Sequence, residues 1–214
     1  MVRVRGRVTL LRANDQFFIQ QDGSGILVQP VVSDAELKVG DTVEVLGRIT
    51  QDEHGVRRLV AGRERASKPP ANLTIRRLTY DDLETPSFGG ALVTVESEIL
   101  SREINRGNVL FDLHIGDDTF TAEVPLAKYQ TTDSLPEVGD SANFTGVARV
   151  HQSNEERRGG VFLETRSAGD VEVVKRRPMR ERVPWLRVAM VATGLAVGFS
   201  SGSGRCETGS ARER

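Results

Sequence analysis

Apolar and polar residues alternate in short runs along most of this chain. Runs of this kind, bounded by Gly, Asp, Asn or Pro, are typical of β-strands that are buried on one face. The Asp22-Gly23-Ser24-Gly25 stretch supplies the residue types that a tight hairpin turn needs. The first third of the chain is therefore predicted to hold five strands, at Val2–Leu10, Gln16–Gln21, Ile26–Gln29, Thr42–Ile49 and Val56–Ala61.

The same series of runs recurs later in the chain. A Val-Gly-Asp turn at Val39–Asp41 returns at Val138–Asp140, an offset of 99 positions. The offset is 91 at the first strand and 94 at the second, so it grows only at turns, where insertions are tolerated. This behaviour indicates an internal duplication. The predicted strands of the second copy are Leu92–Leu100, Val109–Ile115, Phe120–Val124, Ser141–Val150 and Val161–Thr165.

Five short strands with a wider gap between the third and the fourth predict a small Greek-key barrel. The alternative is a pair of unrelated β-meanders, and the repeat favours the barrel. We therefore predict an all-β protein made of two consecutive five-stranded barrels that resemble OB-folds, at residues 1–67 and 91–174.

Residues 68–90 are predicted to be a linker with a short helical turn. Lys68-Pro69-Pro70 ends the first barrel, because proline cannot donate to a strand ladder. Thr79 is the expected N-cap of the turn. Asp82 then takes the third helical position, where a capping-box acid belongs.

The composition changes after residue 174. A basic flank and an apolar run occupy residues 175–199, with Trp185 between them, and residues 200–214 are expected to be a disordered tail. The apolar run Val188–Phe199 would rise only about 18 Å as a helix, against roughly 30 Å of hydrocarbon. Two interpretations remain open for residues 183–199, an incomplete transmembrane segment and a short buried or interfacial helix. A third is that the reading frame departs from its ancestral course near Ser200.

Composition narrows the class of function. Hydrophobic residues at 38% and charged residues at 28% are ordinary for a folded domain. A net charge of -1 and an aromatic content of 5% count against general nucleic-acid binding, which favours a basic excess and stacking platforms. Cys206 is the one cysteine, so no internal disulfide is expected.

No catalytic or metal-binding arrangement is recognisable in the sequence. His54, His114 and His151 lack partners at metal-ligand spacing. Gly23-Ser24-Gly25 is not followed by the lysine and helix of a phosphate-binding loop. We expect a non-enzymatic protein without a cofactor.

The generic ligand-binding surface of an OB-fold is the outer face of strands two and three. Alternation places Phe17 with Ile19 on one face of the second strand, and Phe18 with Gln20 on the other. The ligand-binding candidates are therefore Phe18 and Gln20, with Arg57 and Arg58 on strand five. A packing role is the stronger interpretation for the outward phenylalanine. The second copy has Asp112 and His114 in the corresponding stretch, without a matching aromatic pair.

The order of these features resembles a known family. A barrel with an Asp-Gly-Ser-Gly turn and a Leu37–Asp41 turn, a proline-rich link, a second barrel, Pro184-Trp185 and an apolar run is similar to the tandem OB-like sensory region of bacterial membrane-bound sensor histidine kinases. The resemblance covers Val2 to Phe199. It implies a membrane-associated protein with its barrels outside the cytoplasm. The chain departs from the family in having no leader, an incomplete helix and no kinase domain, so we expect a fragment or a truncated product.

Three hypotheses about function follow. The first is a non-catalytic sensory or protein-binding region of a membrane-associated bacterial signal-transduction protein. The alternative is a soluble OB-fold protein that binds single-stranded nucleic acid. A third is an accessory module of a hydrolase.

Overall fold

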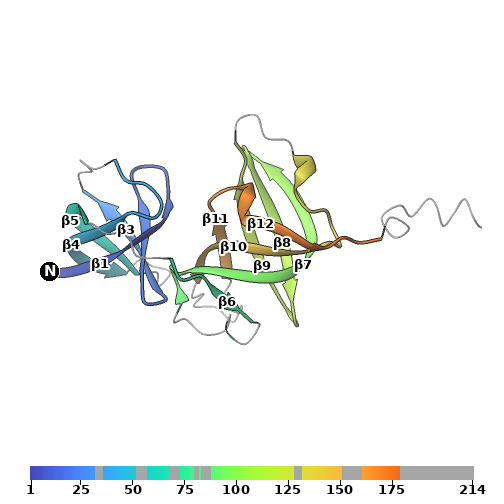
Figure 1. Cartoon of the computed structure of the whole chain (residues 1–214), viewed down its shortest axis with the longest axis horizontal. Helices are drawn as coiled ribbons and strands as arrows, with labels where there is room; N and C mark the ends of the chain where they lie inside the picture. Colours follow the sequence, from blue (N-terminus) through green and yellow to red (C-terminus); the bar gives the residue numbers. More distant parts are fainter. Residues whose placement is uncertain are drawn as a thin grey trace, which may run out of the picture. The chain divides into compact units, whose positions relative to one another are not determined.

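The structure, a computed structural model, describes residues 1–31, 36–51, 57–67, 73–79, 82, 88–127, 132–150 and 161–178. The first five strands form a closed barrel in the order β1-β2-β3-β5-β4 (Figure 1). β3 and β5 run parallel and the other neighbours run antiparallel. The strands of barrel 1 are β1 (Val2–Leu11), β2 (Phe17–Gln21), β3 (Ser24–Pro30), β4 (Thr42–Gln51) and β5 (Arg57–Ser67).

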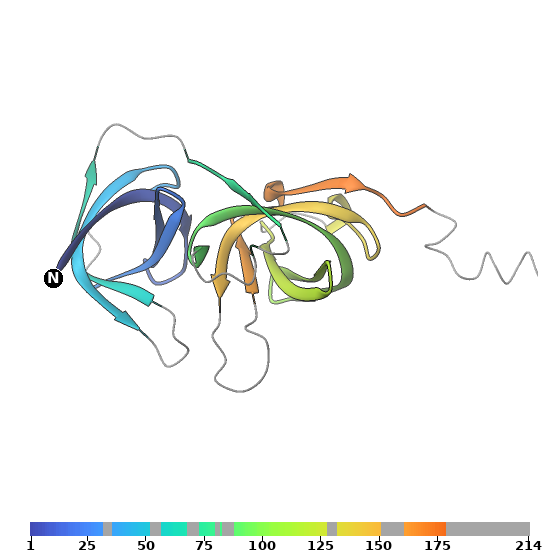
Figure 2. The ribbon, with the colours of Figure 1, turned by 90° about the horizontal axis from the view of Figure 1, so that it is seen from below.

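The second barrel repeats this order and is closed by pairing of β10 with β7. Its long first strand, β7, curves around the barrel (Figure 2). The prediction of an all-β fold with two OB-like barrels is confirmed. The strands of barrel 2 are β7 (Leu92–Asn105), β8 (Asn108–Ile115), β9 (Asp118–Pro125), β10 (Ser141–Val150) and β11 (Val161–Thr165). Two flanking strands are β6 (Arg76–Leu78) and β12 (Val171–Lys175), and two short 3-10 turns are η2 (Thr132–Ser134) and η3 (Ala168–Asp170).

Strand register confirms the duplication residue by residue. Val2 pairs with Gly47 in barrel 1, and Val93 pairs with Gly146 in barrel 2, which reproduces the offsets of 91 and 99. Each first strand also carries a β-bulge at the same place, after Val8 and after Ile99. Two residues with the same register partners are called equivalent below. By this criterion Leu10, Phe18 and Leu27 of barrel 1 are equivalent to Ser101, Asp112 and Thr121 of barrel 2.

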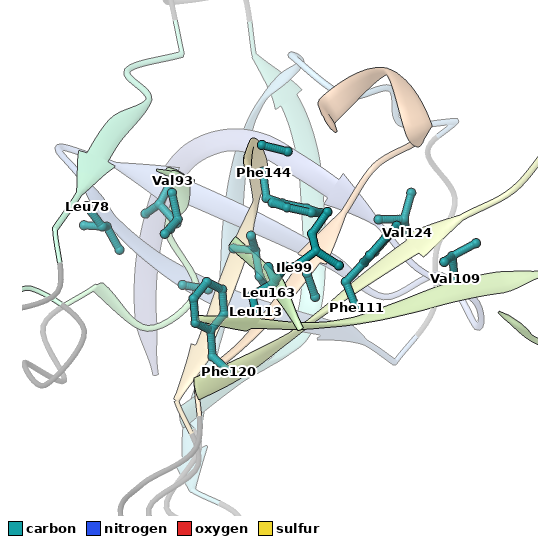
Figure 3. Close-up of a cluster of buried hydrophobic side chains, with 14 of the residues drawn as sticks. Leu78, Val93, Ile99, Val109, Phe111, Leu113, Phe120, Val124, Phe144 and Leu163 are labelled. Carbon is teal, nitrogen blue, oxygen red and sulfur yellow. The ribbon is translucent and has the colours of Figure 1, made fainter. Parts of the chain in front are cut away.

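Each barrel has its own apolar core, built from the inward residues of alternating strands. In barrel 2 the rings of Phe111 and Phe144 meet edge to face, with centroids 5.4 Å apart (Figure 3). Phe17 and Ile19 belong to the core of barrel 1, which confirms the predicted inward face of β2. The barrel 1 core consists of Val8, Phe17, Ile19, Val28, Val43, Val45, Leu59 and Ala61.

The two barrels end differently. β5 runs on to Ser67 and stays paired with β4 as far as Thr42. In barrel 2 the same edge of β10 is paired first with β11 and then with β12, and η3 separates these two strands. The sequence predicted neither the extension of β5 beyond Ala61 nor β12. The extended part of β5 and the strand β12 are both stabilised by pairing with a strand that is distant in the sequence. The alternation of apolar and polar residues within one segment does not predict such pairing.

The linker contributes a strand that the sequence did not predict. β6 pairs in parallel with β7 and buries Leu78 in the core of barrel 2. Beyond it, the carboxylate of Asp82 accepts hydrogen bonds from the backbone N–H and the hydroxyl of Thr79, at 3.0 and 2.9 Å, as the predicted capping arrangement requires. The rest of the predicted turn, at Tyr80, Asp81 and Leu83, lies outside the described residues, as does the predicted C-terminal segment 183–199. Within the described part of the chain, no helix is long and apolar enough to cross a membrane.

Candidate ligand-binding face

The outer face of β2 and β3 in barrel 1 is buried against barrel 2. Leu10 and Phe18 form an apolar cluster with Leu92 on β7 and Val147 on β10, and Leu27 packs at its edge. The Phe18 side chain is only 3% exposed. The OB-fold surface that generally binds ligands therefore serves here as a contact between the barrels. For Phe18, these contacts favour the packing interpretation.

Gln20 connects the barrels by hydrogen bonds. Its Oε1 accepts the backbone N–H of Leu92 at 2.8 Å, and its Nε2 donates to the carbonyl of Thr74 at 3.1 Å. Gln20 is 6% exposed, so both ends of its amide are engaged inside the contact. A buried backbone N–H needs such a partner, and Gln20 supplies it.

Two further contacts complete the interface between the barrels. The backbones of Gly25 and Gly90 approach so closely that a Cβ on Gly25 would lie 1.8 Å from the carbonyl oxygen of Gly90. The Arg12 guanidinium donates to the carboxylate of Glu164 at 2.8 Å, with both side chains half-buried or more. Together these contacts leave no access to Phe18 and Gln20 for a ligand.

The two arginine candidates lie at the side of this interface. Arg58 is the parallel register partner of Leu27, so it continues the outward row that begins at Phe18. Arg58 is half-buried and has an interaction partner of its own, whereas Arg57 is exposed. The four predicted ligand residues thus do not form one open site. Ligand contact at the two arginines stays a prediction.

The equivalent face of barrel 2 is open and polar. Asp112 stands at the position of Phe18, and its carboxylate accepts hydrogen bonds from the hydroxyls of Ser101 and Thr121, at 2.6 and 3.2 Å. These three side chains come from β7, β8 and β9. Asp112 and Ser101 are exposed, and Thr121 is half-buried. His114 takes the position of Gln20 and is half-buried, while His54 and His151 lie outside the described residues.

An aromatic side chain lies next to these polar side chains. Phe162 on β11 is the register partner of Thr121, and Arg149 on β10 is the partner of Phe162. The Arg149 guanidinium carbon lies 5.7 Å from the centre of the Phe162 ring, within range of a cation–π contact. Arg149 also lies 3.8 Å from the carboxylate of Glu164. We call Ser101, Asp112, Thr121, Phe162 and Arg149 the open row.

A shallow hollow of about 260 Å³ lies beside the open row. Leu100, in the β-bulge after Ile99, is 46% exposed at the edge of the hollow, whereas Thr9, in the equivalent bulge of barrel 1, is fully buried. The hollow is smaller than the roughly 300–1,000 Å³ of pockets that enclose a small molecule. It therefore fits a ligand that lies across the face rather than inside it. Its lining residues are Leu100, Asp112, Thr119, Phe120 and Thr121.

The electrostatic surroundings of the two faces also differ. Residues 91–174 hold 7 Lys or Arg against 15 Asp or Glu, a net charge of -8, while residues 1–67 hold 10 against 9. Glu98 and Glu103 on β7 and Glu123 on β9 flank the open row. An acidic excess of this kind favours cations over phosphates. Among the residues described, no group of acidic, histidine or cysteine side chains is arranged to hold a metal ion.

Sequence reasoning placed Asp112 and His114 in the stretch that corresponds to Phe18 and Gln20, but it proposed no residue of the open row as a ligand contact. The offsets of the repeat already placed Asp112 opposite Phe18. Phe162 and Arg149 carried no comparable signal, because only the parallel pairing of β9 with β11 brings them to this face.

Comparisons with known proteins identify no family for this chain. No protein-family model and no curated protein matches it. Solved structures with a related arrangement include a murine DNA-binding protein bound to double-stranded DNA, with 11% identity, a TM-score of 0.38 and coverage of 82% of this chain and 100% of the other. An aspartyl-tRNA synthetase from Entamoeba histolytica has 13% identity, a TM-score of 0.38 and coverage of 63% and 30%. A replication protein A heterotrimer bound to single-stranded DNA has 15% identity, a TM-score of 0.33 and coverage of 58% and 98%. Likeness at this level does not extend to function.

Proposed function

We propose that this chain is a non-catalytic binding module whose ligand lies across the open row of barrel 2. The observation that carries this proposal is the contrast between two equivalent faces. One is apolar and closed by the other barrel, and the other is open and carries hydrogen-bonding and aromatic side chains. The strand two–three face is the surface on which OB-folds generally bind, and only barrel 2 offers it.

The proposed ligand is an extended protein segment that carries Lys or Arg. Asp112 at the centre of the row and the net charge of -8 around it favour a cationic partner. The shallow hollow fits side chains laid along the face better than an enclosed small molecule. This proposal agrees with the expectation of a sensory or protein-binding region.

Fluorescence anisotropy tests this proposal. The probe is a labelled twelve-residue peptide of repeated Gly-Arg-Gly-Ser, and the variants are Asp112→Ala in the open row and Asp133→Ala in η2 as a control with the same change of charge. We expect Asp112→Ala to weaken binding about tenfold, and Asp133→Ala to weaken it less than about twofold. Equal weakening by both variants would show that only the overall charge attracts the peptide, and would remove the open row as the site.

Single-stranded nucleic acid is the second candidate ligand. The observation that favours it is Phe162, an aromatic side chain that lies beside Arg149 and a hydrogen-bonding carboxylate on the same face. Bases stack on such platforms, and a carboxylate accepts from the amino group of cytosine. The acidic surroundings oppose it, because binding to a single strand requires neutralised phosphates.

A labelled twelve-nucleotide oligodeoxycytidine separates the two candidates. The first proposal predicts no binding at low salt. Tight binding that falls steeply as salt rises, and that Phe162→Ala weakens by about tenfold or more, would establish the second candidate instead.

We also propose a wider setting, which depends on the resemblance to sensory regions of bacterial signalling proteins. In that setting the binding module lies outside the cytoplasm and is associated with the membrane through residues 183–199. The genomic DNA that flanks this reading frame tests it. A signal sequence upstream and a kinase frame downstream are expected, and intact unrelated neighbours would contradict the proposal.

A further inference from the structure

The open row carries opposite charges toward its two ends. Asp112 lies on β8 and Arg149 lies on β10. Register pairs connect them across the sheet through Thr121 on β9 and Phe162 on β11. The net charge of barrel 2 does not reveal this polarity, because it sums the whole barrel rather than the row.

The charge of Arg149 is only partly neutralised. Its acidic neighbour, Glu164 on β11, is shared with Arg12 of barrel 1. Arg12 donates to one carboxylate oxygen at 2.8 Å, whereas Arg149 lies 3.8 Å from the other oxygen, beyond hydrogen-bonding distance. No described residue donates a hydrogen bond to this second oxygen. Two guanidinium groups thus share one carboxylate, and positive charge remains at the Arg149 end of the row.

This remaining charge is accessible from the open face. The Arg149 side chain is 24% exposed, and an arginine carries five N–H donors, which leaves donors for a further acceptor. Glu123, the register partner of Glu164, lies two strands from Arg149 and accepts a hydrogen bond from the amide of Asn108. The Arg149 end is therefore suited to a carboxylate that the ligand supplies.

The barrel fold itself does not require this arrangement. The residues of barrel 1 equivalent to Arg149, Phe162 and Glu164 are Thr50, Arg58 and Val60. Barrel 1 closes with the same strand order without a ring and a carboxylate at these positions. The guanidinium, ring and carboxylate thus occur together only on the face that is open.

The spacing of the row sets the spacing of charges in the ligand. Asp112 and Arg149 are separated by three steps between neighbouring strands, about 14 Å at the usual strand spacing. An extended polypeptide advances about 3.4 Å per residue, and alternate residues lie on the same side. A segment laid across the strands therefore brings residue i to Asp112 and residue i+4 to Arg149. Its residue i+2 then lies over Thr121 and Phe162.

We propose that the open row binds a polypeptide segment with opposite charges four residues apart. A Lys or Arg of the segment lies at Asp112, an Asp or Glu lies at Arg149, and an apolar residue between them lies at Phe162. Arg12 is a positioning residue of this site, because its hydrogen bond holds Glu164 away from full pairing with Arg149. This charge pattern rests on the function proposed above and adds which segments the row selects.

Three labelled nine-residue peptides test the pattern by fluorescence anisotropy with the full chain. The first is Gly-Ser-Arg-Ser-Val-Ser-Glu-Ser-Gly, and the second has Gln in place of Glu. The third moves Glu one position toward Arg, which turns it to the opposite side of an extended segment. We expect the first peptide to bind at least about fivefold more tightly than either of the others. Attraction by the acidic barrel as a whole predicts the reverse order for the first two, because the second is more positive.

Substitutions in the protein identify the residues that read the acidic position. Arg149→Gln should bring the first and second peptides to within about twofold of each other. The control Arg106→Gln makes the same change of charge at an exposed turn between β7 and β8, and should keep the preference. Arg12→Gln frees Glu164 to pair with Arg149, so it should reduce the preference, and Arg12→Lys should restore it. General damage to the fold would instead weaken both peptides alike.

The outcomes separate this pattern from the proposed function. Equal binding of the first and second peptides, with both weakened by Asp112→Ala, would overturn the pattern and leave the binding face in place. A preference that survives Arg149→Gln would also overturn it, and one that survives Arg12→Gln would remove Arg12 from the site. If none of the three peptides binds at low salt, the proposed function itself is contradicted.

Discussion

Barrel 1 and barrel 2 use the same outward positions for opposite purposes. Leu10, Phe18 and Leu27 form an apolar surface that barrel 2 covers. The equivalent residues of barrel 2 are two hydroxyl side chains and the carboxylate of Asp112, and they remain open. The duplicated backbone supports both, because outward residues of a small barrel leave its core intact. One copy thus uses this face for contact between the barrels, and in the other it is the face on which we propose that the ligand binds.

The contrast also explains why the barrels form one compact unit, Met1–Arg176. An apolar face without a partner would be exposed to water, and contact with Leu92 and Val147 removes it. Gln20 and the close approach of Gly25 to Gly90 then fix how the two barrels meet. Substitutions at these positions should lower the stability of the protein, and the expected effects are given from the largest to the smallest.

Exchange of the side chains at the equivalent positions 18 and 112 should have the largest effect on stability. Phe18→Asp places a charge inside the apolar cluster and removes an aromatic ring, so we expect a loss of about 4 kcal/mol or more in the free energy of unfolding. Urea denaturation measures it. The reciprocal change, Asp112→Phe, lies on the open face and should cost less than about 1 kcal/mol. Similar costs for the two variants would mean that the faces do not differ.

Addition of a methyl group at the contact between the barrels should have the next largest effect on stability. Gly25→Ala places a Cβ against the backbone of Gly90, so one of the two backbones must move. We expect a loss of about 2–3 kcal/mol in the free energy of unfolding, measured in the same way. Gly169→Ala is the control, because its Cβ would meet only the Ser167 hydroxyl at 3.4 Å. If the two variants unfold at the same urea concentration, the close contact of Gly25 with Gly90 does not exist in solution.

Loss of the bridging amide should be slightly less costly. Gln20→Ala leaves the buried N–H of Leu92 without a partner, which costs about 1–3 kcal/mol. The matched variant at the equivalent position, His114→Ala, should change stability by less than about 0.5 kcal/mol, since it lies on the open face. Hydrogen exchange of the Leu92 amide gives a local readout. Unchanged protection in Gln20→Ala would show that Gln20 is not its partner.

The smallest expected effect concerns the turn after β6. Hydrogen bonds from Thr79, and then the charge of Arg76, hold the pKa of Asp82 below its ordinary value of 3.8. A lowered carboxyl pKa stabilises the fold above that ordinary value, and the stabilisation is lost as the pH falls through the pKa of the folded state. In a carbon-13 NMR titration, Thr79→Ala should raise the pKa of Asp82. No change would mean that the capping contact is absent in solution.

The strands of the two barrels could be predicted from the sequence because the patterns that indicate a strand are local. Alternation separated Phe17 and Ile19 from Phe18 and Gln20, and burial of the first pair in the barrel core confirms that division. The repeat offsets were reproduced by the strand register. Alternation says which side of a strand a residue faces, however, and not what covers that side. Alternation therefore could not predict that barrel 2 buries Phe18.

The candidate site was predicted less well for the same reason. Arg149 and Phe162 come to the open row through pairings between strands far apart in the chain. β6 has only three residues, too few for an alternating pattern, and exists because Leu78 is buried against β7. Such elements depend on tertiary contacts, and a pattern within one segment does not contain them.

The central claim is that one of the two equivalent faces is closed and the other is open. Thiol labelling tests it most directly, with Phe18→Cys and Asp112→Cys each made in a Cys206→Ser background. Maleimide reaction rates are measured for the folded chain and divided by the rates in urea. We expect the cysteine at position 112 to react within about tenfold of its unfolded rate, and the cysteine at position 18 to react at least about a hundredfold more slowly than its own. Equal normalised rates at the two positions would contradict the account.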